Sequence, residues 1–88
     1  MRIREVRITA KFEKNYRKLS QKIKNKAKLR ERLFRENTFH PVLNTHKLHG
    51  GEKEAWAFWI NYIYRIKFIF LEEEVVLFLD IGTHNIYK

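Results

Sequence analysis

One change in the spacing of the apolar residues constrains the fold more than any other feature. Between Lys11 and Phe39, apolar side chains recur every three or four positions, and neither glycine nor proline interrupts the run. This spacing is typical of an amphipathic helix. A single helix of that length is long for a chain of 88 residues, so we expect a break near Ser20 and a helical hairpin.

Strand-like patterns lie on both sides of the helical run. Residues Arg2–Thr9 alternate imperfectly between apolar and charged side chains, which indicates a first strand. The segment Asn37–Pro41 ends the helices, because the residue before a proline favours extended backbone. Beyond it, strands are expected at 47–49, 56–60, 64–71 and 75–81. The turns between them are expected at Gly50-Gly51, Asn61-Tyr62 and Glu72–Glu74.

The order of these elements predicts an α+β domain. An N-terminal strand and a helical hairpin precede an antiparallel sheet of three to four strands, and such segregation places the helices on one face of the sheet. The last strand, Val75–Ile81, is apolar nearly throughout and is expected inside the sheet. A chain of this length supports one small core, so residues 1–88 are expected to form a single domain.

Composition excludes several classes of protein. Hydrophobic residues at 44% and aromatic residues at 15% are too frequent for a disordered chain. The absence of cysteine excludes disulfides and thiolate chemistry and favours the reducing cytoplasm. The N-terminus is charged throughout, unlike a signal peptide. The most apolar stretch, 55–71, contains Asn61, Arg65 and Lys67 and is shorter than the roughly 20 apolar residues of a bilayer span. A soluble protein without membrane contact is expected.

The positive charge is concentrated in the first part of the chain. The net charge is +9, and residues 1–36 hold fourteen of the nineteen Lys and Arg but only four of the ten acids, a local charge of +10. Such a block supplies sequence-independent affinity for nucleic acid and speeds association with polyanions. A solvated lysine-rich helix face and an acidic protein partner remain as alternatives.

Three segments carry a resemblance to a known family. They read HKLHG (46–50), WAFWINYIYRIKF (56–68) and DIGTHNIY (80–87). With these segments the sequence resembles the RelE/ParE superfamily of type II toxins and is nearest to the RelE and YafQ-like mRNA interferases. The likeness follows the whole chain in the order of its elements and is sharpest at Tyr64–Ile66 and Gly82–His84. It implies a toxin that cuts mRNA in the ribosomal A site and is silenced by an antitoxin encoded beside it.

The resemblance implies roles for two histidines. His84 follows Gly82-Thr83 and takes the position of a general acid, and His46 opens the H-x-L-x-G segment as the candidate base. Metal-independent cleavage uses the 2′-hydroxyl of the RNA as nucleophile, so one group must remove a proton and another must supply one. Imidazole suits both tasks, because the ordinary pKa of histidine lies near neutrality.

Four further residues are expected to contact RNA. Arg65 lies on a strand and is the candidate for the scissile phosphate, because a planar guanidinium donates two hydrogen bonds and keeps its charge. Tyr87 is expected to stack on an mRNA base. Lys47 and Lys67 are expected to contact flanking phosphates. The interpretation requires Arg65 and His84 to gather around one pocket.

Structural roles stay open for the same residues. In these alternatives His84 is a surface residue at a strand end, Arg65 is the partner of Asp80 or of Glu72–Glu74 in an ion pair, and Tyr87 is a cap on the core. His40, before Pro41, is expected in a turn.

His46 and His49 have a spacing found in metal sites. However, neither a cysteine nor a nearby acid completes a ligand set, and the two side chains are expected on opposite faces of a strand. We therefore expect no metal and no other cofactor.

Two other functions remain open. ParE-type members of the superfamily poison DNA gyrase without cutting RNA, although they generally lack the terminal G-T-H and tyrosine. An inactive relic is the third possibility, because Trp59 stands where many relatives carry an arginine in the pattern W-S-F-R-I-N. In all three cases the expected partner is an acidic or amphipathic antitoxin, laid along the basic helices or into the cleft. The nuclease interpretation adds the ribosome and mRNA.

Overall fold

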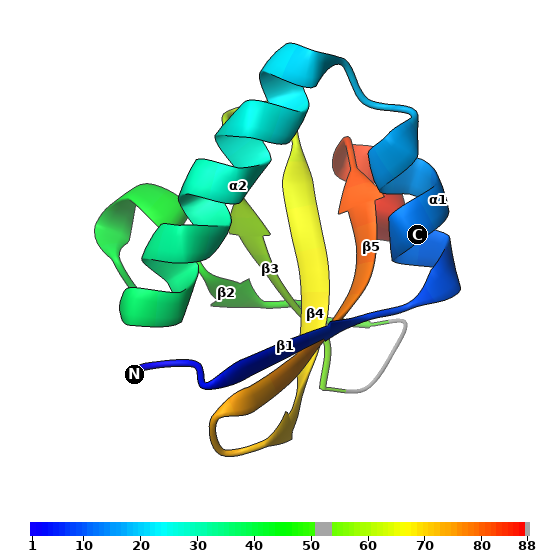
Figure 1. The fold of residues 1–88 in the computed structure, drawn as a ribbon. Coiled ribbons are helices and arrows are strands. Elements are labelled where there is room, and N and C mark those ends of the chain that lie inside the picture. Colours follow the sequence, from blue (N-terminus) through cyan, green and yellow to red (C-terminus); the bar gives the residue numbers. More distant parts are fainter. Residues whose placement is uncertain (51–53, 88) are drawn as a thin grey trace.

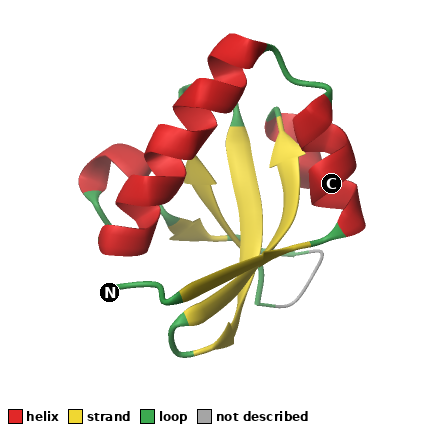
Figure 2. Cartoon of the chain, viewed as in Figure 1, coloured by secondary structure: helices red, strands yellow, loops and turns green. Residues whose placement is uncertain are grey.

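The computed structural model describes residues 1–50 and 54–87. Its strands are β1 (Glu5–Ile8), β2 (His46–Lys47), β3 (Trp56–Trp59), β4 (Arg65–Glu72) and β5 (Val75–Gly82). Its helices are α1 (Ala10–Arg17) and α2 (Gln21–Glu36), with short 3₁₀ turns η1 (Pro41–Leu43) and η2 (His84–Tyr87). Figures 1 and 2 show both helices in front of one twisted sheet.

The sheet has five strands in the order β1-β5-β4-β3-β2. Strands β2 to β5 pair antiparallel, as expected, and β1 joins the far edge parallel to β5. The predicted α+β architecture is therefore confirmed, with β1 as an added fifth strand. Strand β5 pairs on both sides, which confirms its predicted place inside the sheet. Gly50 has the left-handed backbone (φ 75°) of the expected turn, and Gly51 lies outside the described residues.

The helical hairpin breaks where the sequence indicates. The Ser20 hydroxyl accepts a hydrogen bond from the backbone N–H of Ile23 at 3.3 Å and begins α2. The Thr9 hydroxyl accepts from the N–H of Phe12 at 3.0 Å and begins α1. Both caps satisfy N–H groups that have no partner inside the helix. The loop between the helices is therefore fixed by local chemistry.

Both helices cover the same face of the sheet. The ring of Phe34 in α2 lies 4.4 Å from Phe58, 4.9 Å from Phe68 and 5.8 Å from Phe78. Phe12 in α1 adds a contact with Phe78 at 5.4 Å. These aromatic pairs fill the core. Across residues 1–50 and 54–87, no helix combines the length and apolar character needed to cross a membrane.

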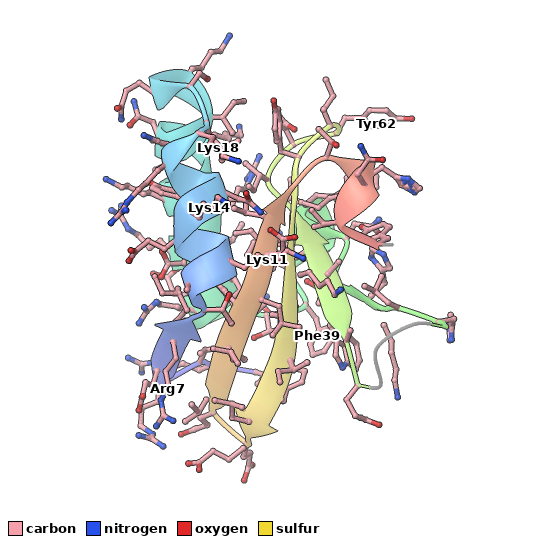
Figure 3. All side chains as sticks on the ribbon, turned by 90° about the vertical axis from the view of Figure 1, so that its right-hand side faces the viewer. Arg7, Lys11, Lys14, Lys18, Phe39 and Tyr62 are labelled. Carbon is pink, nitrogen blue, oxygen red and sulfur yellow. The ribbon has the colours of Figure 1, made fainter. Side chains whose placement is uncertain are left out.

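The face of the sheet opposite the helices carries rows of cross-strand partners that include charged side chains. Cross-strand partners point to the same face, and one row contains Trp59, Arg65 and Gly82. A neighbouring row runs from His46 through Ala57 to Lys67. In Figure 3 the helices lie on one side of the sheet and η2 on the other. The C-terminal turn therefore covers the face that the helices leave open.

Candidate active site

The C-terminal turn η2 packs closely on the sheet because residue 82 is a glycine. A Cβ atom at Gly82 would lie 2.9 Å from Cγ2 of Ile86, which is closer than carbon atoms approach in folded proteins. The N–H of Ile86 donates to the carbonyl of Thr83 at 3.1 Å and closes the turn. His84 at the start of η2 and Tyr87 at its end are thereby held over the helix-free face.

Tyr87 is the residue at which the candidate groups meet. Its ring lies 5.0 Å from the ring of His84 and 6.2 Å from that of His46, edge to face in both pairs. Its hydroxyl accepts a hydrogen bond from Nη1 of Arg65 at 3.2 Å. Strand β2, strand β4 and η2 each bring one of these groups. Arg65 and His84, which the sequence interpretation places around one pocket, both contact Tyr87.

The guanidinium of Arg65 is held by four contacts. Besides the Tyr87 hydroxyl, the carbonyl of Tyr62 accepts from Nη2 at 2.9 Å. The guanidinium carbon lies 4.9 Å from the ring of Trp59 and 5.8 Å from that of Tyr87, both cation–π distances. The Nε of Arg65 and the Nε1 of Trp59 are buried, without an acceptor among the residues the structure describes. The plane of the guanidinium is therefore fixed in advance.

The ion pair considered for Arg65 does not form. Asp80 accepts a hydrogen bond from Nδ2 of Asn15 at 2.7 Å and lies 3.5 Å from Nζ of Lys11. Within the described part of the chain, no carboxylate lies at salt-bridge distance from Arg65. The contacts of the Arg65 guanidinium among the described residues are with neutral groups. Its positive charge is therefore not neutralised by them and can attract an anion.

The tautomer of His46 follows from its hydrogen bond. Its Nδ1 lies 2.7 Å from the carbonyl oxygen of Asn44. A carbonyl only accepts, so Nδ1 carries a proton and donates, and in a neutral ring the lone pair is then on Nε2. Asn44 reaches this position with a left-handed backbone (φ 46°), which asparagine tolerates better than most residues.

Solved structures with the same architecture come from bacteria and an archaeon. A chain of the DinJ–YafQ toxin–antitoxin complex of E. coli aligns over 92% of both chains, with a TM-score of 0.74 and 21% identity. The YoeB/ParE toxin of Agrobacterium tumefaciens aligns over 91% of this chain and 98% of its own, with a TM-score of 0.76 and 13% identity. This chain has the RelE/ParE toxin fold. A chain of the RelE–RelB complex of Pyrococcus horikoshii OT3 aligns over 94% of this chain and 96% of its own (TM-score 0.71, 14% identity).

The likeness to the RelE/ParE fold is one of structure. No family model matches the sequence, and no curated protein matches it either. The three short segments that resemble the RelE/ParE superfamily map onto β2, onto the β3–β4 hairpin and onto β5 with η2. These are the elements that build the site around Tyr87.

The two lysines expected at phosphates lie in different environments of the RelE/ParE fold. Lys47 on β2 is exposed, with its ammonium 3.9 Å from the carboxylate of Glu54. Lys67 is only 6% exposed, and its Nζ donates to the carbonyl of Ile86 at 3.4 Å. Burial beneath η2 does not fit the expected phosphate contact of Lys67. The strand pattern gives the correct face for Lys67, but it does not reveal that η2 covers it.

The remaining histidines lie outside the site. His40 is the turn residue that the sequence predicts, since its Nδ1 accepts from the N–H of Val42 at 3.1 Å. His49 is exposed beyond the end of β2. In the described ranges, no cluster of three or more His, Cys, Asp or Glu side chains is placed to bind a metal.

Two residues of the site were not assigned a role by the sequence interpretation. The sequence marks Trp59 only as a departure from relatives and Tyr62 only as part of a turn. The alternation of Trp56–Ile60, together with the tip at residues 61–62, could have paired Trp59 with Arg65. The exposure of Tyr62 had no comparable signal in the sequence.

Proposed function

We propose that the chain is the toxin of a type II toxin–antitoxin pair and cuts mRNA on the ribosome. The observation that carries this proposal is the meeting of His46, Arg65 and His84 at Tyr87. Cleavage by the 2′-hydroxyl of the RNA needs a base, an acid and a fixed cation around one phosphate. These three side chains supply that set within one cluster.

The tautomer of His46 supports its role as the base. Because Nδ1 donates to the Asn44 carbonyl, Nε2 is free to take the proton of the 2′-hydroxyl. The 2′-oxygen then bonds to phosphorus while the bond to the 5′-oxygen breaks, which leaves a 2′,3′-cyclic phosphate. His84, exposed at the start of η2, gives its proton to the departing 5′-oxygen. Proton transfers of this kind typically contribute 10²–10⁴-fold to the rate.

The donors of Arg65 support its role as the phosphate clamp. A guanidinium has five N–H donors. Tyr87 and Tyr62 each accept from one of them, and the Nε donor is buried. Two terminal donors remain, enough for a bidentate contact with the non-bridging oxygens. In the same proposal Tyr87 contacts a base, and the exposed Lys47 contacts a flanking phosphate.

The proposed partners are an antitoxin and the ribosome. The DinJ–YafQ and RelE–RelB structures are complexes, which supports a cognate antitoxin here. A hollow of about 330 Å³ between α1, α2 and β1 offers an apolar floor with charged edges, which suits an amphipathic segment. The basic block of residues 1–36 supports docking on ribosomal RNA. The proposed location is accordingly the cytoplasm.

The substitution His84→Ala tests the nuclease function. Expressed without antitoxin, the parent chain should arrest growth and produce new 5′ ends within codons of translated mRNA. The alanine variant should lose 10²–10⁴-fold in cleavage rate and relieve the arrest, because the leaving oxygen loses its acid. His49→Ala is the matched control, since His49 is an exposed histidine outside the site.

Two results would contradict the nuclease function. One is full toxicity of the His84→Ala variant. The other is growth arrest with intact mRNA and an SOS response, which would favour the gyrase-poisoning alternative. A melting curve that matches the parent's ensures that loss of activity is not loss of fold.

A further inference from the structure

We infer that Tyr62, at the tip of the β3–β4 hairpin, is a stacking surface for the nucleobase adjacent to the phosphate that Arg65 binds. The inference rests on the proposed nuclease function and adds a substrate contact to it. The proposed cleavage chemistry gives the side chain of Tyr62 no role.

The ring of Tyr62 stands in solvent at the end of the sheet that carries the site. Its exposed fraction is 78%, and that of the neighbouring Ile63 is 58%. Figure 3 shows Tyr62 projecting from this end of the sheet, away from the two helices. Single exposed apolar side chains are common on proteins, so exposure needs support from the surrounding geometry.

Four hydrogen bonds hold the backbone of the hairpin tip. The Oδ1 of Asn61 accepts from the N–H of Ile63 at 2.9 Å and from that of Tyr64 at 2.7 Å. The N–H groups of Ile60 and Asn61 both donate to the carbonyl of Tyr64, at 2.9 and 3.3 Å. A surface that is ordered before binding loses less conformational entropy when a ligand arrives. The backbone of the tip is therefore already ordered before a ligand binds.

Tyr62 and the phosphate clamp form one unit. The backbone carbonyl of Tyr62 accepts from Nη2 of Arg65 at 2.9 Å. Its ring lies 5.8 Å from that of Trp59, edge to face, and Trp59 in turn lies against the guanidinium of Arg65. A nucleotide whose phosphate is bound by Arg65 therefore lies next to the residue that carries this ring.

The ring of Tyr62 also has more free surface than that of Tyr87. Tyr87 contacts His46, His84 and Arg65, whereas Trp59 is the one ring contact of Tyr62 among the described residues. Stacking on single-stranded RNA needs an open aromatic face and is worth about 1–3 kcal/mol per base, or roughly 5- to 150-fold in affinity. The occupant that fits beside a cation site is therefore a base of the RNA.

The test uses ribosomes programmed with a short mRNA that carries 2-aminopurine beside the scissile position. A 2′-O-methyl group at the scissile nucleotide prevents cleavage. The parent chain and Tyr62→Phe should quench the fluorescence, because both stack an aromatic ring on the base. Tyr62→Ala should leave it unquenched and bind roughly 5- to 150-fold more weakly. Ile63→Ala, which removes exposed apolar surface from the same tip, should behave like the parent.

Cleavage of the unmodified mRNA supplies the second measurement. Tyr62→Ala should raise KM by the same factor and leave kcat within about twofold, since base stacking acts before the chemical step. Quenching and KM unchanged in Tyr62→Ala overturn the inference. Weakened antitoxin binding by Tyr62→Ala and Ile63→Ala, with RNA binding intact, also overturns it and makes the tip a protein contact.

The same measurements separate this inference from the proposed function. A parent chain that quenches the probe in a Tyr62-dependent way but never cuts RNA contradicts the nuclease function and leaves the stacking surface in place. A parent chain that cuts normally while Tyr62→Ala is silent in both measurements contradicts the stacking surface alone. A parent chain that neither cuts nor quenches contradicts both.

Discussion

Arg65 has five N–H donors, and its neighbours use them unequally. Two bonds, to the Tyr62 carbonyl and the Tyr87 hydroxyl, fix the fork in its plane, and the ring of Trp59 lies against its face. A lysine could keep the charge here but not the planar fork with two donors left over. Trp59, in the position where many relatives carry an arginine, thus lies against the face of this cation.

The two substitutions Trp59→Leu and Trp59→Phe separate the aromatic face of residue 59 from its bulk. Loss of the cation–π contact with Arg65 costs about 1 kcal/mol at a half-buried site, so Trp59→Leu should lower kcat/KM roughly fivefold. Trp59→Phe should keep most activity because it keeps a ring. It also loses no hydrogen bond, since Nε1 has no acceptor within the described residues. Cleavage on programmed ribosomes measures both variants.

Melting curves provide the control for residue 59. Both variants remove part of a half-buried indole, so similar losses of stability are expected from them. Equal activity of the leucine and phenylalanine variants would show that the aromatic face is not what positions Arg65.

At the scale of elements, local signals were predictable and long-range contacts were not. The helical hairpin follows from residue spacing and from a serine, Ser20, that caps the helix beginning at the next residue. The parallel pairing of β1 with β5 joins residues about seventy positions apart, and no local pattern encodes it. The four-residue turn η2 is too short for any periodicity, although it decides that Lys67 is buried.

The residue types of the candidate site follow from the sequence, whereas its geometry does not. Family resemblance indicated His46 and His84, and the chemistry of a planar guanidinium indicated Arg65. All three contact Tyr87 in the structure. Tyr87 has its central place because η2 folds back over the sheet and brings Tyr87 to His46 on β2 and Arg65 on β4. The sequence pattern does not encode these long-range contacts.

The packing of η2 leads to a prediction for Gly82→Ala. The new Cβ would lie 2.9 Å from Cγ2 of Ile86, and this methyl group is on a stiff β-branched side chain. Overpacking of this kind typically costs 1–3 kcal/mol. Because η2 must shift, His84 and Tyr87 shift with it. The rate of mRNA cleavage by Gly82→Ala should therefore fall further than its loss of folding stability alone would explain.

A double-mutant cycle with Ile86→Ala checks the cause of this effect. Ile86→Ala removes the methyl group that Gly82→Ala would meet, so the cost of Gly82→Ala should be smaller in that background than in the parent. Additive costs, measured by chemical denaturation, would place the effect of Gly82→Ala elsewhere than in this contact.

At the scale of the whole molecule, a row of basic side chains and the candidate active site lie on different elements. Arg7, Lys11, Lys14 and Lys18 form a row along β1 and α1 in Figure 3, away from η2. Arg7 is paired with Glu5, and its hydrogen bond lowers the pKa of that carboxyl; Lys11 is paired with Asp80. For Lys14 and Lys18, no acid in the described part of the chain lies at salt-bridge distance.

Lys14 and Lys18 should determine how strongly ribosome binding depends on salt concentration. Each phosphate contact contributes about 0.7–0.9 to the slope of log affinity against log salt, so Lys14→Ala with Lys18→Ala should reduce that slope by roughly 1.4–1.8. The value of kcat should not change, because the row contacts none of His46, Arg65 and His84. Replacing both lysines by arginine keeps the charge and should keep the slope. A double-alanine variant with the parent's slope would mean that another surface of the block 1–36 faces the ribosome, and that this row is a solvated helix face.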